Sequence, residues 1–347
     1  MKAVVKSKPE AGFDYVADHP ERPVGPGEVR VQVAAASLCG TDRELVRYGA
    51  AAEAFGLALP MVLGHEVSGT VVEVGPGVQR LRIGDRVALE SHITCRNCYH
   101  CRVGEGHNCL HMALLGLHVD GGFAERVVIP EHACFTLPDD IATETGALFE
   151  SAGVAVHAAL RSQATLAGRS VIIAGAGPIG LALVQLAGTS GARRTVVVEP
   201  NPFRRTIAES FGAIALDADE GAVDWCLGDA ADRGGFDVGF DCTGAPGALD
   251  IVLRSLRREA TAVCVGVPEQ PFALDVIRYL IKHGITLKGS FGRSLWQTWD
   301  VLGALVSRGR LDLAGLVTHR MGLSGFQDAL DLQGGDSGKV LLVPSIG

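Results

Sequence analysis

The sequence predicts an α/β protein that combines a small β-barrel with a doubly wound parallel sheet. Three observations support this prediction. Short strand patterns separated by glycine-rich turns fill residues 1–148, strands alternate with helices over residues 149–291, and four cysteines cluster within residues 95–109. The first pattern is typical of a barrel, and the second is typical of a parallel sheet covered by helices.

Composition narrows the function classes before any motif is considered. The chain has 347 residues, is 47% hydrophobic and carries a net charge of −8, with no dense run of lysine or arginine. This balance argues against a surface for nucleic acid or for an anionic membrane. The nine cysteines are an odd number, and Met1–Lys6 lacks the apolar core of a signal peptide. We therefore expect a protein of the reducing cytoplasm.

The barrel half is predicted from its strand and turn patterns. Residues Glu28–Val33 alternate between apolar and polar side chains, as a half-buried strand does. Ser68–Gly75 and Asp85–Ala88 are further short strands by the same reasoning. Turns such as Gly25-Pro26-Gly27 separate them, which favours many short strands over a few long ones.

The cysteine cluster predicts a metal site. Two residues separate Cys95 from Cys98 and Cys98 from Cys101, and Cys109 follows after seven more. This spacing lets a tight loop direct successive sulfurs at one point, as tetrahedral zinc requires. Disulfides or a C-x-x-C redox pair are the alternatives, but a redox pair would need only two of the four thiols. Zinc held by four cysteines is structural, and it would order a lobe at about residues 92–112.

From residue 149 onward, strands alternate with helices. Ser170–Ala174 is predicted to be a buried strand, followed by a glycine-rich turn and a helix to about Ser190. Thr195–Val198 is the next strand, and Asn201 can cap a helix that runs to about Phe211. The later elements predicted in this way are strands at 236–241, 261–267 and 285–289 and helices near 246–257 and 295–307.

The glycine-rich turn, Gly175-Ala176-Gly177-Pro178-Ile179-Gly180, predicts a dinucleotide site. The first glycine permits the tight turn, the second lets the backbone approach a pyrophosphate at the helix N-terminus, and the third allows close packing. A turn that serves packing alone is the alternative. The context favours the cofactor, because the turn links a strand to a helix and Glu199 ends the next strand.

Glu199 also bears on which cofactor binds. Its carboxylate can accept hydrogen bonds from a ribose and would repel a 2′-phosphate, which favours NAD over NADP. Arg204 and Arg205 point the other way, since arginine near this position can bind that phosphate. A solvated helix face or a contact with adenine are the other interpretations of these arginines.

Two further motifs, Cys39-Gly40-Thr41-Asp42 and Gly64-His65-Glu66, complete a pattern. Together with the cysteine cluster and the dinucleotide turn, they resemble the zinc-dependent medium-chain alcohol dehydrogenases over essentially the whole chain. That resemblance implies a GroES-like catalytic domain at residues 1–148, an inserted Rossmann NAD-binding domain at 149–291 and a return segment at 292–347. Within the family, stretches such as Pro60–Glu66 and Val317–Arg320 look like the L-threonine 3-dehydrogenases.

The resemblance also implies the site residues. Cys39, His65 and an acid, either Glu66 or Glu150, would hold a catalytic zinc and leave one position open. Asp42 would orient His65, although a solvated turn carboxylate is the alternative. Thr41 and His92 would pass the proton, with packing in the zinc lobe as the alternative for His92. The cofactor contacts it implies are Gly175, Gly177, Pro178, Ile179, Gly180, Glu199, Arg204, Val265, Val267, Ser290 and Phe291.

The chain departs from the family close to where substrate would bind. Ser151 and Val154 replace a proline and an asparagine, and Glu44 stands where a histidine is common. The loop 47–56 lacks the aromatic character typical of threonine dehydrogenases. These departures leave a polyol, sugar or aminocyclitol dehydrogenase as the alternative to a threonine enzyme, because substrate choice is determined by loops.

The expected reaction is the reversible oxidation of a secondary alcohol with NAD, with one catalytic and one structural zinc. A zinc-free reductase on the same fold would lack the cysteine and histidine ligands. A non-enzymatic dinucleotide-binding protein would not be expected to keep them. We also expect a homo-oligomer, most simply a tetramer, because the strand 285–289 should form a bare sheet edge that a second copy can cover.

Overall fold

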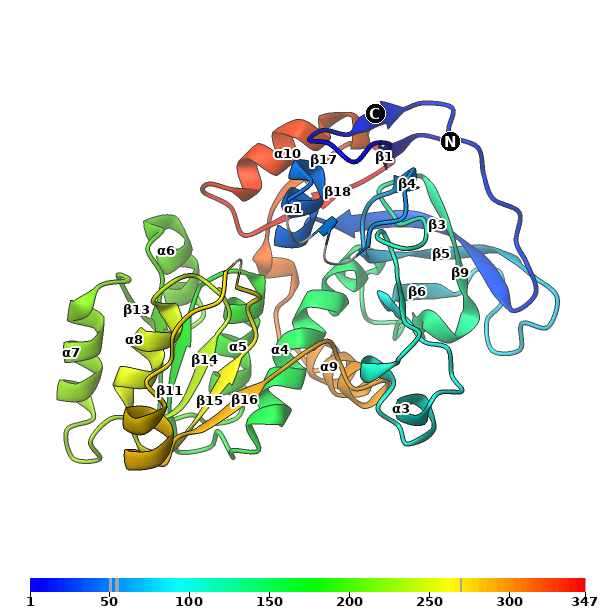
Figure 1. Ribbon diagram of the computed structural model, residues 1–347. Coiled ribbons are helices and arrows are strands. Elements are labelled where there is room, and N and C mark those ends of the chain that lie inside the picture. The colour runs from blue at the N-terminus through cyan, green and yellow to red at the C-terminus, as the bar shows by residue number, and fades with distance from the viewer. Residues whose placement is uncertain (50–51, 54–55, 269, 347) are drawn as a thin grey trace. The chain divides into compact units, whose positions relative to one another are not determined.

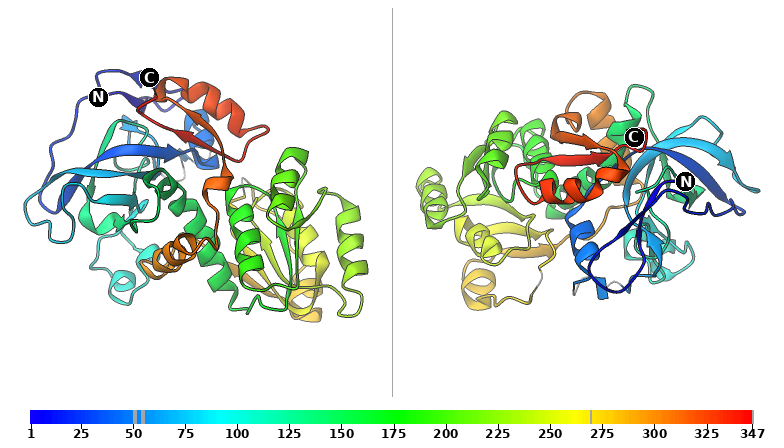
Figure 2. Two further views of the ribbon diagram at one scale, coloured as in Figure 1. Left: turned by 180° about the vertical axis from the view of Figure 1, so that it is seen from behind. Right: turned by 90° about the horizontal axis from the view of Figure 1, so that it is seen from above.

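The computed structural model describes residues 1–49, 52–53, 56–268 and 270–346. Its chain divides into two compact units. The first comprises Met1–Ser151, Ser294–Ser307 and Leu313–Gly347, and the second comprises Ala152–Arg293 with Arg308–Asp312. The first unit is therefore assembled from segments far apart in the sequence, as the colours in Figures 1 and 2 show.

The first unit is built on a mostly antiparallel sheet in the order β10-β6-β5-β3-β18-β17, with β9 also paired to β3. A smaller sheet, in the order β2-β1-β4, and the pair β7-β8 complete its strands. A continuous apolar core fills the unit, with Val31, Val67 and Phe123 among its buried members. These short strands agree with the predicted barrel half, and the α/β fold class is confirmed.

The strands of the first unit are β1 Ala3–Lys6, β2 Asp14–Val16, β3 Glu28–Ser37, β4 Met61–Val62, β5 Glu66–Val74, β6 Arg86–Leu89, β7 His92–Ile93, β8 Ala113–Leu114, β9 Arg126–Pro130, β10 Cys134–Thr136, β17 Val317–Met321 and β18 Lys339–Leu342. The helices of this unit for which the structure gives bounds are α1 Gly40–Arg47, α3 Tyr99–Arg102, α9 Gln297–Ser307 and α10 Phe326–Gln333, with short 3₁₀ turns between them.

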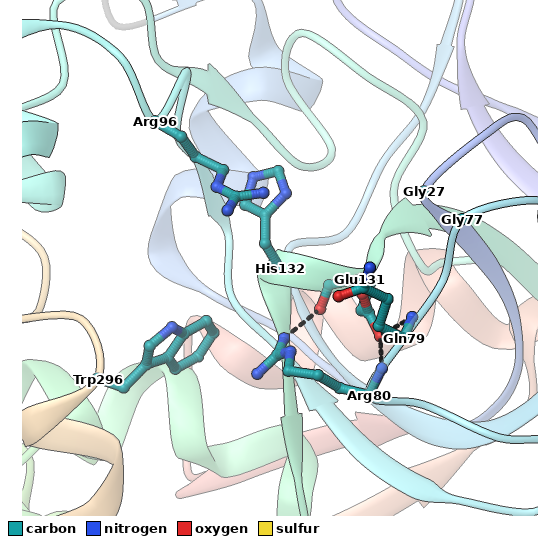
Figure 3. A pocket seen from close by; sticks show the side chains of 8 residues that line it. All are labelled: Gly27, Gly77, Gln79, Arg80, Arg96, Glu131, His132 and Trp296. Carbon is teal, nitrogen blue, oxygen red and sulfur yellow. Dashed lines mark hydrogen bonds between the residues drawn. The ribbon is translucent and has the colours of Figure 1, made fainter.

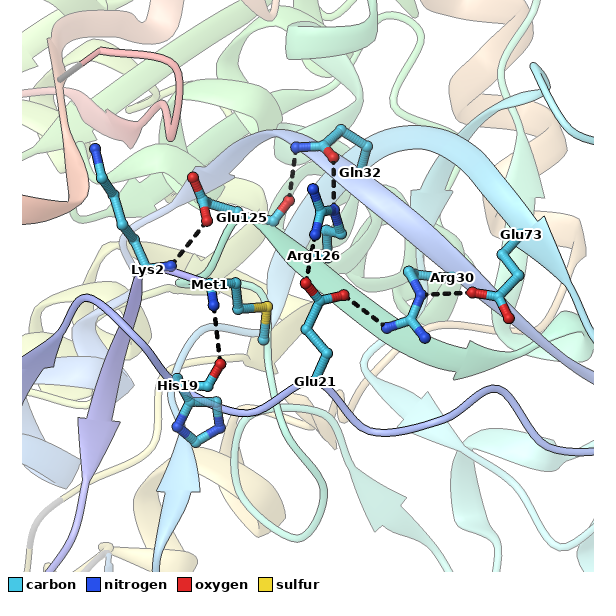
Figure 4. Close-up of polar contacts among 9 residues, drawn as sticks. All are labelled: Met1, Lys2, His19, Glu21, Arg30, Gln32, Glu73, Glu125 and Arg126. Carbon is cyan, nitrogen blue, oxygen red and sulfur yellow. Dashed lines mark hydrogen bonds and ion pairs between the residues drawn. The ribbon is translucent and has the colours of Figure 1, made fainter.

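Polar side chains cover the exposed face of β3 and β9 (Figure 4). Glu21 forms ion pairs with Arg30, at 3.0 Å, and with Arg126. Arg30 also reaches Glu73 of β5 at 2.8 Å. Apolar residues alternate with these polar ones, so one face of the sheet contacts water and the other contacts the core.

The second unit is a six-stranded sheet in the order β13-β12-β11-β14-β15-β16, and every neighbouring pair in it is parallel. The strand order reverses direction between β11 and β14, which is where ligands bind in sheets of this kind. α5 packs with α6 and α7 packs with α8. Right-handed crossovers place these two pairs on opposite faces of the sheet.

The strands of this unit are β11 Ser170–Ala174, β12 Arg194–Val198, β13 Ile214–Leu216, β14 Phe236–Asp241, β15 Leu256–Cys264 and β16 Thr286–Gly289. Its helices are α5 Pro178–Thr189, α6 Pro202–Ser210, α7 Glu220–Asp229, α8 Ala248–Ser255 and the short π-helix Ile277–Lys282. α4, Phe149–Ser162, begins in the first unit and continues into the second.

Several boundaries differ from those expected, and the largest difference is in β15. The predicted strand 261–267 is shifted, because β15 begins at Leu256 and ends at Cys264. Arg257 joins the strand through a 2.8 Å ion pair with the buried Asp237 of β14, a partner that local sequence does not reveal. The helix expected from residue 295 begins at Gln297. The predicted cap is present, since Asn201 accepts hydrogen bonds from the amides of Phe203 and Arg204.

Candidate active site

Strand pairing places three of the predicted metal ligands together. β3 and β5 run antiparallel with Ser37 opposite Glu66. Cys39 follows β3 as the N-cap of α1, and His65 immediately precedes β5. The ligand atoms of Cys39, His65 and Glu66 all lie within 4.8 Å of one another. The two separate sequence motifs therefore form one cluster in the first unit.

The donors in this cluster fit a divalent transition metal. Thiolate, imidazole and carboxylate are ligands of zinc sites that leave a fourth position for substrate. Oε1 of Glu66 is buried and has no hydrogen-bond partner among the described residues. Such an atom is costly to bury alone, and a cation would satisfy it.

Asp42 orients the imidazole. It is fully buried, which excludes a solvated turn carboxylate, and its Oδ1 lies 3.5 Å from His65 Nδ1. Its Oδ2 accepts a hydrogen bond from the Cys39 amide at 2.8 Å. Burial alone would lower the pKa of His65, but the charges of Asp42 and Cys39 outweigh it and hold that pKa well above its ordinary value. Nδ1 faces Asp42, so Nε2 is the nitrogen suited to a metal.

Glu66 is paired with a cation from the far end of the chain. Lys339 of β18 contacts Glu66 Oε2 in a fully buried ion pair and also donates to the Leu38 carbonyl at 3.1 Å. Ser151 donates to the same carboxylate oxygen at 3.2 Å. Burial raises the pKa of Glu66, Lys339 opposes that effect, and the nearby Glu150 adds to it. Neither Lys339 nor the contact of Ser151 was predicted from the sequence.

The other acid proposed as a ligand has a different environment. Glu150 lies at the start of α4 and accepts a 2.8 Å hydrogen bond from the Ser91 hydroxyl. It is outside the group formed by Cys39, His65 and Glu66, although it is close enough to influence the Glu66 carboxyl. Thr41 Oγ1 lies 3.7 Å from Cys39 Sγ, so its hydroxyl borders the cluster.

His92 has a partner that the sequence analysis missed. It opens β7 and is buried, and its Nδ1 lies 3.0 Å from Oε1 of the fully buried Glu90. Trp299 of α9 donates to the other oxygen of Glu90 at 2.8 Å. A single acid directly after the apolar strand Val87–Leu89 is the signal in the sequence that would have drawn attention to Glu90.

The four-cysteine cluster has the dimensions of a zinc site. The Sγ atom of Cys98 lies 3.5 Å from Sγ of Cys101 and 3.9 Å from Sγ of Cys109. The Sγ atoms of Cys95 and Cys101 are 4.0 Å apart. Four sulfurs around a zinc ion at 2.3 Å would be about 3.8 Å apart. The backbone amides of Cys101 and Leu110 lower the pKa of the Cys98 thiol to about 6, which favours the thiolate that zinc requires.

The dinucleotide turn joins β11 to α5, as predicted. Gly175 has φ +95°, and a Cβ at Gly180 would lie 1.9 Å from the Gly175 carbonyl oxygen. Only glycine fits both positions. A Cβ at Gly177 would meet nothing within 4 Å, so the space in front of the helix N-terminus is open to a phosphate.

Glu199 is buried beyond the end of β12 and contacts this turn. Its Oε2 accepts a hydrogen bond from the Ala176 amide at 2.8 Å, and its Oε1 accepts one from the Asn201 amide at 3.0 Å. The Arg205 guanidinium donates to the carbonyls of Glu199 and Pro200, at 2.7 and 3.0 Å. Arg205 therefore contributes to the shape of this corner as well as to its charge.

The other predicted cofactor residues lie on the helix α6 or beyond the carboxyl ends of parallel strands. Val265 and Val267 follow β15, and Ser290 and Phe291 follow β16, where Val267 and Phe291 are exposed. Arg204 lies in α6. Because the strands are parallel, these ends meet at one edge of the sheet, the edge where dinucleotides bind.

A separate hollow of about 510 Å³ lies in the first unit (Figure 3). Its lining includes Arg80, Arg96, His132 and Trp296, and none of the predicted site residues. Glu131 also lines it, but its carboxylate accepts hydrogen bonds from the amides of the loop 79–81. His132 lies 3.2 Å from the Thr94 carbonyl, so the hollow packs beside the zinc lobe and is not the candidate active site.

The geometry defines a class of protein, a two-unit oxidoreductase with groups of candidate metal ligands in one unit and a dinucleotide-type fold in the other. Comparisons with known proteins agree. Residues 25–139 match the alcohol dehydrogenase GroES-like domain, and residues 178–308 match the zinc-binding dehydrogenase domain.

Relatives cover nearly the whole chain. The L-threonine 3-dehydrogenase of Pectobacterium carotovorum subsp. carotovorum is 36% identical over 99% of this chain and 98% of its own. The enzyme of the same name from Thermococcus kodakarensis is 36% identical over 100% of this chain and 99% of its own.

Solved structures are similar over the same length. Galactitol-1-phosphate dehydrogenase from Escherichia coli superposes with a TM-score of 0.88 at 28% identity, covering 99% of this chain and 100% of its own. An E. coli alcohol dehydrogenase complexed with NADH gives 0.88 at 26%, covering 99% of each chain. A zinc-binding dehydrogenase from Sinorhizobium meliloti bound to NADP gives 0.86 at 29%, again covering 99% of each.

The chain belongs to the zinc-dependent alcohol dehydrogenase family. It is an oxidoreductase that acts on CH–OH groups, and it is about 36% identical over its full length to proteins named L-threonine 3-dehydrogenase. No helix among the described residues is long and apolar enough to cross a membrane.

Proposed function

We propose that this enzyme oxidises a secondary alcohol to a ketone with NAD, in the manner of an L-threonine 3-dehydrogenase. The observation that carries the proposal is the buried convergence of Cys39, His65 and Glu66 in a chain whose full-length relatives have that name. A dinucleotide-binding protein without catalysis would have no use for this set of ligands.

The proposed chemistry is divided among named residues. Zinc, when bound, supplies a Lewis acid that polarises the alcohol oxygen. Cys39 Sγ, His65 Nε2 and a carboxylate of Glu66 or Glu150 would hold it. NAD, when bound, would accept the hydride of the C–H bond, and Thr41 and His92 would carry away the O–H proton as the alcohol becomes a ketone. NADH, ketone and one proton balance the reaction.

We propose two zinc ions per chain, one in each cysteine-containing group. The catalytic group has three donor residues and an open position, while the lobe has four thiols and no opening. Metal analysis of the purified, zinc-loaded protein tests this directly. One zinc or fewer per chain would contradict it.

NAD is the proposed cofactor. The supporting observation is the buried carboxylate of Glu199 beside the turn, where a 2′-phosphate would meet a negative charge. Related structures contain NADH in one case and NADP in another, so family membership alone does not decide between them.

Substrate identity has a second candidate. The similar structure galactitol-1-phosphate dehydrogenase is named for a polyol phosphate. This chain departs from the family pattern at Glu44 and Ser151, and its loop 47–56 lacks the aromatic character of threonine dehydrogenases. Residues 50–51 and 54–55 of that loop are outside the described residues. A polyol, sugar or aminocyclitol is therefore the alternative substrate class.

A substrate panel tests the proposal. Purified enzyme loaded with zinc is mixed with NAD and with L-threonine, polyols, sugars or amino-polyols, and NADH absorbance is followed. We expect the highest kcat/KM with L-threonine. A polyol or amino-polyol in first place would favour the alternative, and no turnover with any secondary alcohol would contradict the proposed function.

Assembly and compartment complete the proposal. We propose a cytoplasmic homotetramer in which β16, the edge strand of the parallel sheet, pairs with its copy in a second subunit. Exposed apolar side chains, among them Ile277 and Ile281, lie in the segment before β16 and would be covered by that contact. All nine cysteines are free thiols, which supports a reducing compartment.

A further inference from the structure

Glu90 is a fully buried acid beside the segment that carries His92. The residue follows β6, is fully buried, and its own amide is bonded to the Ala133 carbonyl at 2.8 Å. Three donors converge on its carboxylate. The His92 amide lies 2.8 Å and His92 Nδ1 3.0 Å from Oε1, and Trp299 Nε1 lies 2.8 Å from Oε2.

These bonds determine the state of the imidazole. A buried carboxylate is costly unless hydrogen bonds compensate its charge, and the His92 amide and the Trp299 indole both donate to Glu90. An ionised carboxylate accepts but cannot donate, so a neutral His92 ring that bonds to it carries its proton on Nδ1. The lone pair of the ring is then on Nε2, the atom that can accept a proton.

The same segment connects His92 to the candidate ligand acid. Ser91, between Glu90 and His92, donates to Glu150 Oε1 at 2.8 Å. Trp299 packs against Phe149, the neighbour of Glu150, with ring centroids 5.9 Å apart. Trp299 is itself fully buried in α9. The segment 90–92 is therefore fixed by bonds on both sides, and the His92 ring cannot turn without breaking them.

We propose that Glu90 is the positioning residue for His92, and that with Trp299 it fixes the ring orientation and the Nδ1–H tautomer needed for proton transfer. The inference rests on the proposed function, in which His92 carries the proton. Glu90 acts through His92 and touches neither substrate nor cofactor in this role.

The first test reads the tautomer and needs no substrate. Protein labelled with ¹⁵N-histidine is examined by long-range ¹H–¹⁵N NMR, and His92 is assigned by comparison with His92→Asn. We expect Nδ1–H in the wild type and the loss of that preference in Glu90→Ala, which has no side-chain acceptor. An Nε2–H tautomer in the wild type, or an unchanged signal in Glu90→Ala, would overturn the inference.

The second test is a double-mutant cycle in kinetics, with the best alcohol of the panel and NAD. Loss of a group that orients a functional side chain costs about 10–100-fold in activity, and we expect Glu90→Gln to lower kcat by that factor with little change in KM. In the His92→Asn background, Glu90→Gln should have almost no further effect. Additive losses would mean that Glu90 does not act through His92.

Two further variants control the experiment. Trp299→Phe keeps an aromatic ring but removes one bond to Glu90, and we expect a smaller fall in kcat, of about 3–10-fold, with zinc content unchanged. It also serves as the test if Glu90→Gln does not fold. Glu105→Gln removes a similar carboxylate–histidine contact, to His100 at 3.0 Å on the protein surface, and should leave kcat unchanged.

Different results would contradict the proposed alcohol dehydrogenase activity and the proposed positioning role of Glu90. If no alcohol of the panel is oxidised, the proposed function is contradicted, while the NMR experiment still decides whether Glu90 fixes the ring. If turnover is found but the tautomer does not depend on Glu90, only the positioning role is lost.

Discussion

Cys39 is the N-cap residue of a short helix, its backbone amide is bonded to Asp42, and its sulfur lies beside His65. We predict that Cys39→Ser lowers kcat by about 10³-fold or more, because losing the metal removes several kcal/mol of stabilisation from the transition state. Fold and NAD binding should remain, as judged by circular dichroism and by quenching of protein fluorescence.

Cys226→Ala, a change in α7 remote from both cysteine-containing groups in the sequence, is the matched control for that experiment. It should keep activity near the wild-type value. Retained turnover in Cys39→Ser would show that the catalytic site has been assigned to the wrong residues.

Glu199 is the residue that should select the cofactor. We predict that Glu199→Ala weakens the binding of NAD by about tenfold, because a partner of the ribose is lost. The same change should improve the use of NADP relative to NAD, because a negative charge that opposes the 2′-phosphate is removed. Glu199→Gln separates the effect of the negative charge from that of the hydrogen bond. The glutamine side chain is uncharged, but its oxygen can still accept the bond from the Ala176 backbone amide. Steady-state kinetics with both cofactors give the ratio.

Glu209→Ala provides the control, since Glu209 is an exposed acid on the same helix as Arg204 and the change in net charge is identical. A wild-type enzyme that already prefers NADP would contradict the assignment of Glu199 and would make Arg204 a candidate phosphate ligand.

Side-chain contacts between residues far apart in the sequence could not be predicted, whereas residues in local motifs could. Cys39, His65 and the four lobe cysteines were found because their motifs are local. Lys339 contacts Glu66 across 273 positions, and Trp299 contacts Glu90 across 209. Folding brings those pairs together, and no spacing rule applied to one sequence identifies them.

Among the structural elements, the zinc lobe is organised by its metal ligands more than by regular structure. Between β7 and β8 it contains only α3, of four residues, and a 3₁₀ turn. We predict that Cys98→Ser removes one zinc and lowers the free energy of unfolding by about 2–4 kcal/mol, because a lobe without an apolar core depends on the metal.

Zinc analysis together with urea unfolding would measure both effects. Cys226→Ala, with all four lobe thiols intact, should keep the full zinc content. A fully loaded and equally stable Cys98→Ser protein would rule out a metal role for the cluster.

The amino ends of β11, β14 and β15 are joined by one buried acid. Asp237 accepts the Ser170 amide at 3.0 Å and pairs with Arg257 at 2.8 Å and Arg169 at 3.2 Å. Burial alone would raise the pKa of Asp237, but these donors outweigh it and lower the pKa. Its contribution to stability is therefore complete above the unfolded value of about 3.9 and is lost as pH falls through the lower folded value.

We predict that Asp237→Ala costs about 2–4 kcal/mol at pH 7, since the Ser170 amide is left unsatisfied and the arginines lose their partner. The difference from wild type should shrink in acid, below about pH 4. Urea unfolding at a series of pH values measures it. Asp232→Asn, at an exposed acid paired with Arg233 at 3.9 Å, should change stability by less than about 0.5 kcal/mol.

Element prediction succeeded where periodicity was strong. β11, α5, β12 and α6 lie close to their expected bounds because buried strands, a glycine turn and an asparagine cap each leave a local signal. β13 was missed, because its three residues form a strand only by pairing with β12. The polar start of β15, Arg257–Glu259, was assigned in part to the preceding helix because its partner Asp237 is remote in sequence.

At the scale of the whole molecule, the edge strand β16 of the parallel sheet is the basis for a prediction of the oligomeric state. Among the residues that the structure describes, β16 pairs only with β15, and exposed Ile277 and Ile281 precede it. We predict a tetramer by light scattering at micromolar concentration, and dissociation when Ile277→Glu and Ile281→Glu are combined. A tetramer also needs a second contact to join two dimers, and we assign it to the zinc lobe, where Leu110 is an exposed apolar side chain. Leu110→Glu should therefore give a dimer.

If the wild-type protein is a dimer, the contact through the sheet edge can still be correct, but a contact through the zinc lobe is excluded. A monomeric wild type would contradict both. Dissociation by the double variant with unchanged zinc content would locate the contact on the second unit.

The pairing of β18 with β3 has a consequence for synthesis on the ribosome. Leu341 lies opposite Ser37, so the central sheet of the first unit lacks a strand until almost the whole chain has been made. All strands of the second unit lie within Ala152–Arg293, and that unit can fold while the tail is still being translated. Until β18 has been synthesised, the edge of β3 that it covers stays unpaired and can pair with another chain. The buried ion pair between Lys339 and Glu66 also forms only at that stage.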